Sequence, residues 1–185
     1  MTEQRITSRK NPLLQQVKKL LSSRKAREEA GLFAADGVKL LGEAVRWYPG
    51  LDTVILSEGV HADVPESVRL FRVPEDVMAS ISPMESPQGA FALFLCRLPE
   101  KKAYEPRSGC LLLDGIQDPG NLGTILRTAD ALDIPVTLLE GCADPYSPKT
   151  ARATMGAVFR RNVYQCTADE LCALLQKCGL PIYGT

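Results

Sequence analysis

The sequence predicts an α/β fold throughout, built from two units that are joined by a short linker. Strand-like and helix-like segments alternate along most of the chain, which is the pattern of sheets covered by helices. This pattern is interrupted at 99–108, where two prolines and mixed charges occur without periodicity. With 45% hydrophobic and 24% charged residues, the composition is that of an ordinary globular protein. We therefore assign 1–98 to a first domain, 99–108 to a linker and 109–185 to a second domain.

The first domain begins with an amphipathic helix, which we expect over 12–29. Apolar residues recur there at i, i+1, i+4, i+7 and i+8, while basic residues fill the opposite face. The apolar stripe consists of Leu13, Leu14, Val17, Leu20 and Leu21. The remaining segments are expected to be strands at 33–35, 53–56, 68–73 and 90–96, and helices at 38–47 and 74–80.

The second domain shows a regular order of strands and helices. The segments expected there are strand 110–113, turn 114–120, helix 122–132, strand 136–139, helix 148–159, strand 162–165, helix 168–178 and a final strand from Leu180. This alternation predicts a parallel sheet with covering helices. Because the chain stops in or just after the last expected strand, we expect this parallel α/β domain to be incomplete.

Charge is distributed unevenly along the chain, although the net charge is zero. Residues 1–27 contain eight basic side chains and one acidic one, Glu3, which leaves +7 in this segment and −7 in the rest. Such a segment is typical of a polyanion-binding face, because each Lys or Arg docked on a phosphate releases counterions. A solvated helix surface explains the same charges equally well. The candidates for phosphate contact in this segment are Arg9, Lys10, Lys25 and Arg27.

The residue types that carry chemistry exclude several classes of protein. The six cysteines include no Cys-x-x-Cys pair and His61 is the only histidine, so we expect no metal site and no histidine-dependent triad. The sequence has neither a signal-peptide core nor an apolar stretch near the ~20 residues of a membrane span. We therefore expect a cytoplasmic protein with reduced thiols. Trp47 and Phe159 are expected in the core or at a domain contact.

The segment 114–133 is the most informative for function. An apolar strand ends in a turn formed by Asp118-Pro-Gly120, and a helix follows with Asn121 near its cap. The carboxyl end of a parallel strand, followed by a helix N-terminus, is a common ligand site in α/β sheets. The spacing matches neither a dinucleotide fingerprint nor a phosphate-cradling loop. A structural turn with a helix cap would explain Gly120 and Asn121 equally well.

Arg127 is the second candidate in this segment. It lies on an otherwise apolar helix, where a guanidinium calls for an anionic partner. That partner is either a bound ligand or an internal carboxylate, Asp114 or Asp118.

Two stretches of the second domain resemble motifs of the SpoU, or TrmH-like, methyltransferases of the SPOUT superfamily. The stretch 114–133, with Asn121, Gly123 and Arg127-Thr-Ala, resembles the first motif of that family. The stretch Asp144-Pro-Tyr-Ser-Pro-Lys149, followed by 152–159, resembles the loop and helix after its second strand.

The first domain resembles the substrate-binding domain that precedes many SpoU enzymes. The similar segments are Asn11-Pro, Lys25-x-Arg27, Phe33-x-x-Asp36-Gly, Glu43-Ala and Ser86-Pro-Gln-Gly89. Most members carry Glu-Gly where this chain has Asp36-Gly, which is a modest departure.

The resemblance implies a SPOUT-type fold and transfer of a methyl group from S-adenosylmethionine to a ribose 2′-hydroxyl of ribosomal or transfer RNA. Arg127 would then be catalytic. Because a guanidinium is reluctant to give up its proton, we expect it to grip the adjacent phosphate and orient the hydroxyl. Asn121, also catalytic, would fix the loop or the arginine. RNA is the expected partner, and the expected RNA contacts are Arg9, Lys10, Lys25, Arg27, Lys149 and Arg152. For Lys149 and Arg152 a solvated surface is an equally good interpretation.

The remaining motifs of the family would follow residue 185. They are a Gly-Ser-Glu-x-x-Gly turn and an apolar segment ending in Ser-Leu-Asn, which in the family form a trefoil knot, most of the donor pocket and much of a homodimer interface. We therefore expect the donor-binding residues beyond 185, and a truncated chain with impaired or no activity. Two alternatives stay open: a non-catalytic RNA-binding protein derived from this family, and an unrelated nucleotide-binding regulatory domain.

Overall fold

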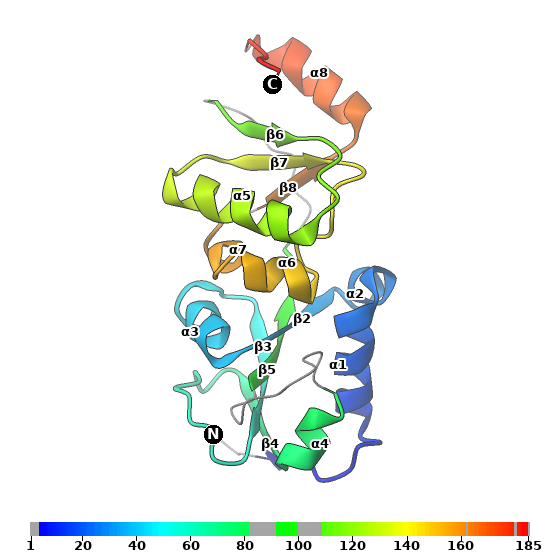
Figure 1. Cartoon of the computed structure of the whole chain (residues 1–185), viewed down its shortest axis with the longest axis vertical. Helices are drawn as coiled ribbons and strands as arrows, with labels where there is room; N and C mark the ends of the chain where they lie inside the picture. The colour runs from blue at the N-terminus through cyan, green and yellow to red at the C-terminus, as the bar shows by residue number, and fades with distance from the viewer. Residues whose placement is uncertain (1–3, 82–91, 100–108, 162, 180, 185) are drawn as a thin grey trace.

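The computed structural model describes residues 4–81, 92–99, 109–161, 163–179 and 181–184 of the 185-residue chain. It is an α/β protein with two sheets, as expected from the sequence. Figure 1 shows the two sheets one above the other along the long axis of the molecule. The expected linker beyond residue 99 and the motif Ser86–Gly89 lie outside the described residues.

The first sheet has five strands in the order β1-β4-β3-β5-β2. Their bounds are Gln4–Arg5, Arg69–Val73, Leu51–Ser57, Ala92–Arg97 and Leu32–Asp36 in that order. Strands β1, β4 and β3 run parallel to one another, whereas β5 runs antiparallel to both β3 and β2. Helix α4 (Glu75–Ala79) follows β4.

Helix α1 (Pro12–Ser22) forms because its start and its apolar face are both encoded locally. The Asn11 side chain accepts a hydrogen bond from the Leu13 backbone N–H, and proline occupies the first turn. Leu14, Val17 and Leu20 are buried against one face of the first sheet. The single helix expected over 12–29 is wrong in one respect, because the chain breaks at residue 23 and continues as α2 (Arg24–Ala30).

Helix α3 (Val38–Trp47) covers the opposite face of the first sheet and has the bounds expected from the sequence. Its buried residues Leu40, Leu41 and Ala44 join Phe33 and Phe94 in a second apolar cluster. The alternation of side chains along β2 divides the core in this way, since successive residues of a strand point to opposite faces.

The second sheet contains three parallel strands, β6 (Leu111–Leu113), β7 (Val136–Leu139) and β8 (Val163–Cys166), in that order. Helix α5 (Pro119–Ala131) covers one face through Leu122, Leu126 and Ala129. Helix α8 (Ala168–Cys178) follows β8. Residues 181–184 are not in a strand, so the strand expected from Leu180 is not found in the part of it that is described.

The helix expected over 148–159 is two helices, α6 (Pro148–Ala153) and α7 (Ala157–Arg160). Between them Met155 and Gly156 have left-handed backbone dihedrals, with φ of 50° and 96°. A right-handed helix cannot pass through such residues, so the direction of the chain changes there.

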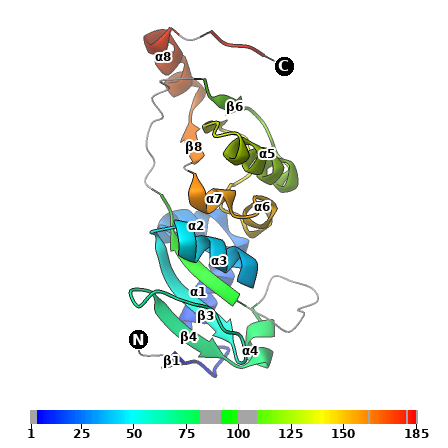
Figure 2. The ribbon, with the colours of Figure 1, turned by 90° about the vertical axis from the view of Figure 1, so that its left-hand side faces the viewer.

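The two domains share one apolar core. Tyr146, Val158 and Phe159 of the second domain pack with Phe33 and Phe94 of the first, so that α6 and α7 lie between the two sheets (Figures 1 and 2). The ring centroids of Phe33 and Tyr146 are 5.0 Å apart, and those of Phe94 and Phe159 are 5.8 Å apart. Phe159 therefore has the buried position expected from the sequence.

Trp47 does not have the buried position expected from the sequence, because 48% of its surface is exposed. Among the described residues no helix is long and apolar enough to cross a membrane, and no cluster of three or more His, Cys, Asp or Glu side chains is placed to hold a metal ion.

Candidate functional site

The candidate site is built around the start of α5, at the carboxyl end of β6. The Asp118 carboxylate accepts a hydrogen bond from the Asn121 backbone N–H at 2.8 Å and so caps the helix. Pro119 takes the first helical position, so α5 begins three residues earlier than expected. Asp118, which was expected in a turn, is thus the N-cap residue that sets where α5 begins.

Gly123 allows α5 to press against α6. A Cβ atom at this position would lie 2.4 Å from the Cβ of Ala153 and 3.0 Å from the carbonyl oxygen of Thr150. Only glycine fits this spacing. The close approach brings α6, with its two basic residues, beside the start of α5.

Arg127 is exposed on α5, two turns after the start of the helix. No carboxylate among the described residues lies within ion-pair distance of its guanidinium, and Asp114 and Asp118 do not bind it. The internal ion pair considered from the sequence is therefore absent in the described part of the chain. The guanidinium is free to bind an external anion.

Asn121 is also exposed, but it does not contact Arg127. Six residues separate them, which corresponds to a rise of about 9 Å along the helix and to different faces. The Asn121 side chain makes no hydrogen bond to a described residue. The arrangement does not support the expectation that Asn121 holds the arginine, and Asn121 is exposed at the N-terminus of α5.

Lys149 and Arg152 lie on α6 beside this site. The Lys149 ammonium is 3.8 Å from an Asp118 carboxylate oxygen, and both side chains are largely exposed. Arg152 donates a hydrogen bond of 2.6 Å to Asp36, at the end of β2 in the first domain. The other carboxylate oxygen of Asp36 is buried and has no partner among the described residues. Asp36, the position where the family usually carries Glu, therefore holds a residue of the site in place from the other domain.

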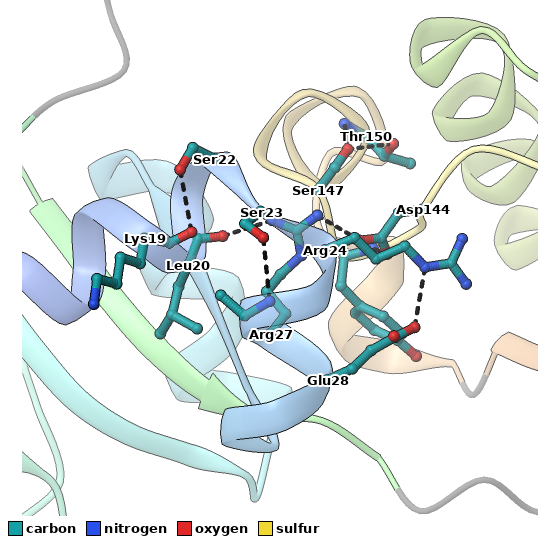
Figure 3. Close-up of polar contacts among 12 residues, drawn as sticks. Lys19, Leu20, Ser22, Ser23, Arg24, Arg27, Glu28, Asp144, Ser147 and Thr150 are labelled. Carbon is teal, nitrogen blue, oxygen red and sulfur yellow. Dashed lines mark hydrogen bonds and ion pairs between the residues drawn. The ribbon is translucent and has the colours of Figure 1, made fainter.

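Arg27 differs from what the sequence led us to expect. Only 4% of its surface is exposed, and its guanidinium donates two hydrogen bonds to one carboxylate oxygen of Asp144, at 2.9 and 2.6 Å. A third hydrogen bond, of 2.5 Å, goes to the carbonyl oxygen of Leu20 (Figure 3). With only 5% of the side chain exposed, this guanidinium is not accessible to an RNA phosphate. We reassign Arg27 from RNA contact to packing between the domains.

The other three basic candidates of the first domain are at the surface. Arg9 pairs with Asp76 at 3.0 Å, and Lys25 lies 3.8 Å from Glu29 on the same helix. Lys10 is exposed, and its side chain has no partner among the described residues. Exposed pairs of this kind are weak, so they do not prevent these side chains from binding phosphate.

A cavity of about 730 Å³ lies at the carboxyl ends of β7 and β8. Among its lining residues are Thr137, Leu139, Cys142, Gln165, Leu174 and, from the first domain, Arg24. The Thr137 hydroxyl is buried without a partner among the described residues. Neither Asn121 nor Arg127 is among the residues that line this cavity.

Three of the described thiols are made less reactive by burial. Burial raises the pKa of the Cys96 thiol, and to a smaller extent those of Cys110 and Cys166. A raised pKa leaves less of the reactive thiolate at neutral pH.

Sequence reasoning missed Asp144 and Asp36 as residues that shape the site. Each pairs with an arginine more than a hundred residues away in the sequence, so no local pattern connects the partners. One signal was present for Asp144, because it opens the loop that resembles the second family motif.

Comparison with known proteins agrees with this arrangement. Residues 109–185 match the SpoU rRNA Methylase family, and residues 11–92 match the MRM3-like substrate binding domain. A curated relative, the 23S rRNA guanosine 2′-O-methyltransferase RlmP of Bacillus subtilis, is 33% identical over 184 residues, which are 97% of this chain and 72% of that protein. The chain belongs to the SpoU methylase family.

Other members of the family are longer than this chain to different extents. Mitochondrial rRNA methyltransferase 3 of Xenopus tropicalis is 34% identical over 162 residues, which are 81% of this chain and 39% of that protein. Among solved structures, the AdoMet-bound rRNA methyltransferase from Sinorhizobium meliloti has a TM-score of 0.76 at 28% identity, and the alignment covers 95% of this chain and 69% of that one. The SPOUT-type fold expected from the resemblance is thereby confirmed.

Proposed function

We propose that this SpoU family member acts in the methylation of a ribose 2′-hydroxyl in ribosomal or transfer RNA, with S-adenosylmethionine as the methyl donor. The observation that carries the proposal is Arg127, an exposed arginine without a carboxylate partner in the described chain, on the helix that starts at the carboxyl end of β6. The names of RlmP and of the AdoMet-bound neighbour support this reaction and this donor.

Arg127 binds a phosphate next to the target ribose and orients its 2′-hydroxyl. Guanidinium and phosphate form paired, charge-assisted hydrogen bonds, which fix orientation as well as position. A base is not the role of Arg127 in this proposal, since guanidinium groups do not give up their proton in proteins. Its positive charge instead favours the alkoxide character that the oxygen gains as it loses its proton.

Lys149 and Arg152 extend this contact along the RNA backbone. Both lie on α6, which Gly123 allows to pack tightly beside α5. Arg9, Lys10 and Lys25 are the proposed backbone contacts of the first domain. We also propose that the chain consists of two domains, 1–98 and 109–185, with a linker between them. The proposed compartment is the cytoplasm.

In this proposal the methyl donor binds to residues other than those that line the cavity described above, because Arg127 is not among the lining residues. We accordingly propose that the 185 residues by themselves bind RNA and methylate it poorly or not at all. We propose a homodimer only for full-length members of the family, and none for the 185 residues by themselves. A purely RNA-binding role is the alternative that the experiment below separates.

The test combines two titrations. S-adenosylmethionine is titrated calorimetrically into this chain and into the same chain extended through any downstream reading frame, and each protein is then tested for methyl transfer from labelled donor to rRNA and tRNA. We expect donor binding and transfer only with an extended chain, and loss of transfer in the Arg127→Ala variant of that chain. Arg69→Gln, which removes an exposed arginine of β4, is the matched control and should retain transfer.

Donor binding by the 185 residues would contradict the assignment of the donor site. RNA binding without transfer by either protein would favour the purely RNA-binding alternative. An Arg127→Ala variant with undiminished transfer would remove the proposed role of this residue.

A further inference from the structure

Trp47 is the only tryptophan of the chain, and it is left half-exposed at the end of α3. The Arg46 guanidinium lies 4.9 Å from the centroid of its ring. Tryptophan is highly buried on average, so an indole at the surface with a cation beside it indicates a contact surface.

The same side of α3 carries more positive charge. Lys39, Glu43 and Arg46 are spaced i, i+4 and i+7, which places them along one stripe of the helix. Glu43 is paired with Arg160 of α7. Lys39 and Arg46 have no carboxylate partner among the described residues. The stripe therefore presents two unneutralised cations next to an exposed aromatic ring.

This stripe is continuous with the site at Arg127. Arg160, the partner of Glu43, also donates a hydrogen bond of 2.8 Å to Asp130 of α5. Asp130 follows Arg127 by three residues, so the two are neighbours on the helix surface. In Figure 1, α7 lies between α3 and α5. Two ion pairs thus connect the helix that carries Trp47 to the helix that carries Arg127.

The contact between α3 and the start of α7 is close. A Cβ atom at Gly156 would lie 2.7 Å from Cγ of Glu43. The relative position of the two helices is therefore fixed by packing, and the distance between Trp47 and the site is set by the fold rather than by a loose linker.

We propose that Trp47, with Arg46 and Lys39, forms a stacking platform for an unpaired base of the RNA substrate. The inference rests on the proposed function and specifies the kind of RNA: a single-stranded or looped segment that passes from the platform across α7 to Arg127. Aromatic rings bind unstacked bases face to face, and adjacent cations hold the phosphates. The bases of a regular duplex are already stacked and cannot reach the ring.

A single tryptophan makes the test direct. An RNA hairpin with an unpaired loop and a perfect duplex of the same length are each titrated into the 185-residue protein. RNA binding is followed by the anisotropy of a dye on the RNA, and Trp47 is followed by its own emission. We expect the hairpin to quench the emission in step with its binding, and the duplex to bind without quenching.

Substitutions separate stacking from folding. Trp47→Ala should weaken binding of the hairpin by roughly 5- to 150-fold and leave binding of the duplex unchanged, whereas Trp47→Phe should retain most of the affinity. Replacing both Lys39 and Arg46 by Gln should reduce the dependence of binding on salt. Thermal unfolding of each variant shows whether it is folded, and Arg69→Gln is again the control.

Each outcome has a distinct meaning. Binding of the hairpin with unchanged Trp47 emission would overturn the platform and leave the proposed function standing. Absence of binding to either RNA would refute both. Emission that changes with protein concentration, without RNA, would show that Trp47 contacts a second copy of the chain, which also overturns the proposal.

Discussion

Removal of the Asp144 carboxylate should destabilise the protein far more than the loss of a surface ion pair. The side chains of Arg27 and Asp144 are 5% and 13% exposed. In an Asp144→Ala variant the guanidinium keeps its bond to the carbonyl of Leu20 and loses the acceptor for its other two bonds. Each buried donor without a partner costs about 1–3 kcal/mol, so the expected loss is about 2–6 kcal/mol. This agrees with the ~3–5 kcal/mol found when one partner of a buried pair is removed.

The free energy of unfolding is measured by urea titration followed by circular dichroism. Asp76→Ala, which breaks the exposed pair with Arg9, serves as the matched control and should cost about 0–1 kcal/mol. The double variant Arg27→Met/Asp144→Leu replaces the pair by apolar side chains of similar size, and should recover most of the stability. A loss for Asp144→Ala no larger than that of the control would refute the view that this pair is buried and joins the domains.

Three further predictions concern local features. Gly123→Ala should lower the melting temperature, since overpacking against α6 costs about 1–3 kcal/mol, whereas Gly42→Ala, in open space on α3, should raise it; equal effects would contradict the close packing of α5 on α6. Asp118→Ala should cost about 0.5–2 kcal/mol by loss of the cap of α5, and an unchanged melting temperature would exclude the cap. Cys96, whose pKa is raised by burial, should resist a thiol reagent at neutral pH in the folded protein while the exposed Cys172 reacts; the reverse order, seen by mass spectrometry, would refute the buried position.

Local patterns in the sequence were sufficient for most of the secondary structure. The stripe containing Leu14, Val17 and Leu20 predicted α1, and the bounds expected for α3, β7 and α8 are those observed. These features depend on residues within a few positions of one another, where helical or strand periodicity and capping decide the outcome. The strand, turn and helix around Asn121 and Arg127 were predicted in the same way, whereas the role of these two residues stays a prediction.

Tertiary structure alone decided how the two domains meet. The sequence predicted Arg27 to be part of a basic surface. In the structure it is buried between the two domains, where it donates hydrogen bonds to Asp144, which is 117 residues away. The break at Met155 and Gly156 turns a predicted single helix into two, because α7 must pack against Glu43 of α3. These outcomes depend on burial and on pairing between distant segments, and the energy of a long-range contact is not encoded in the spacing of neighbouring residues. The sequence by itself therefore determined most of the elements and predicted the candidate site, while the packing of the two domains decided which charged residues remain at the surface.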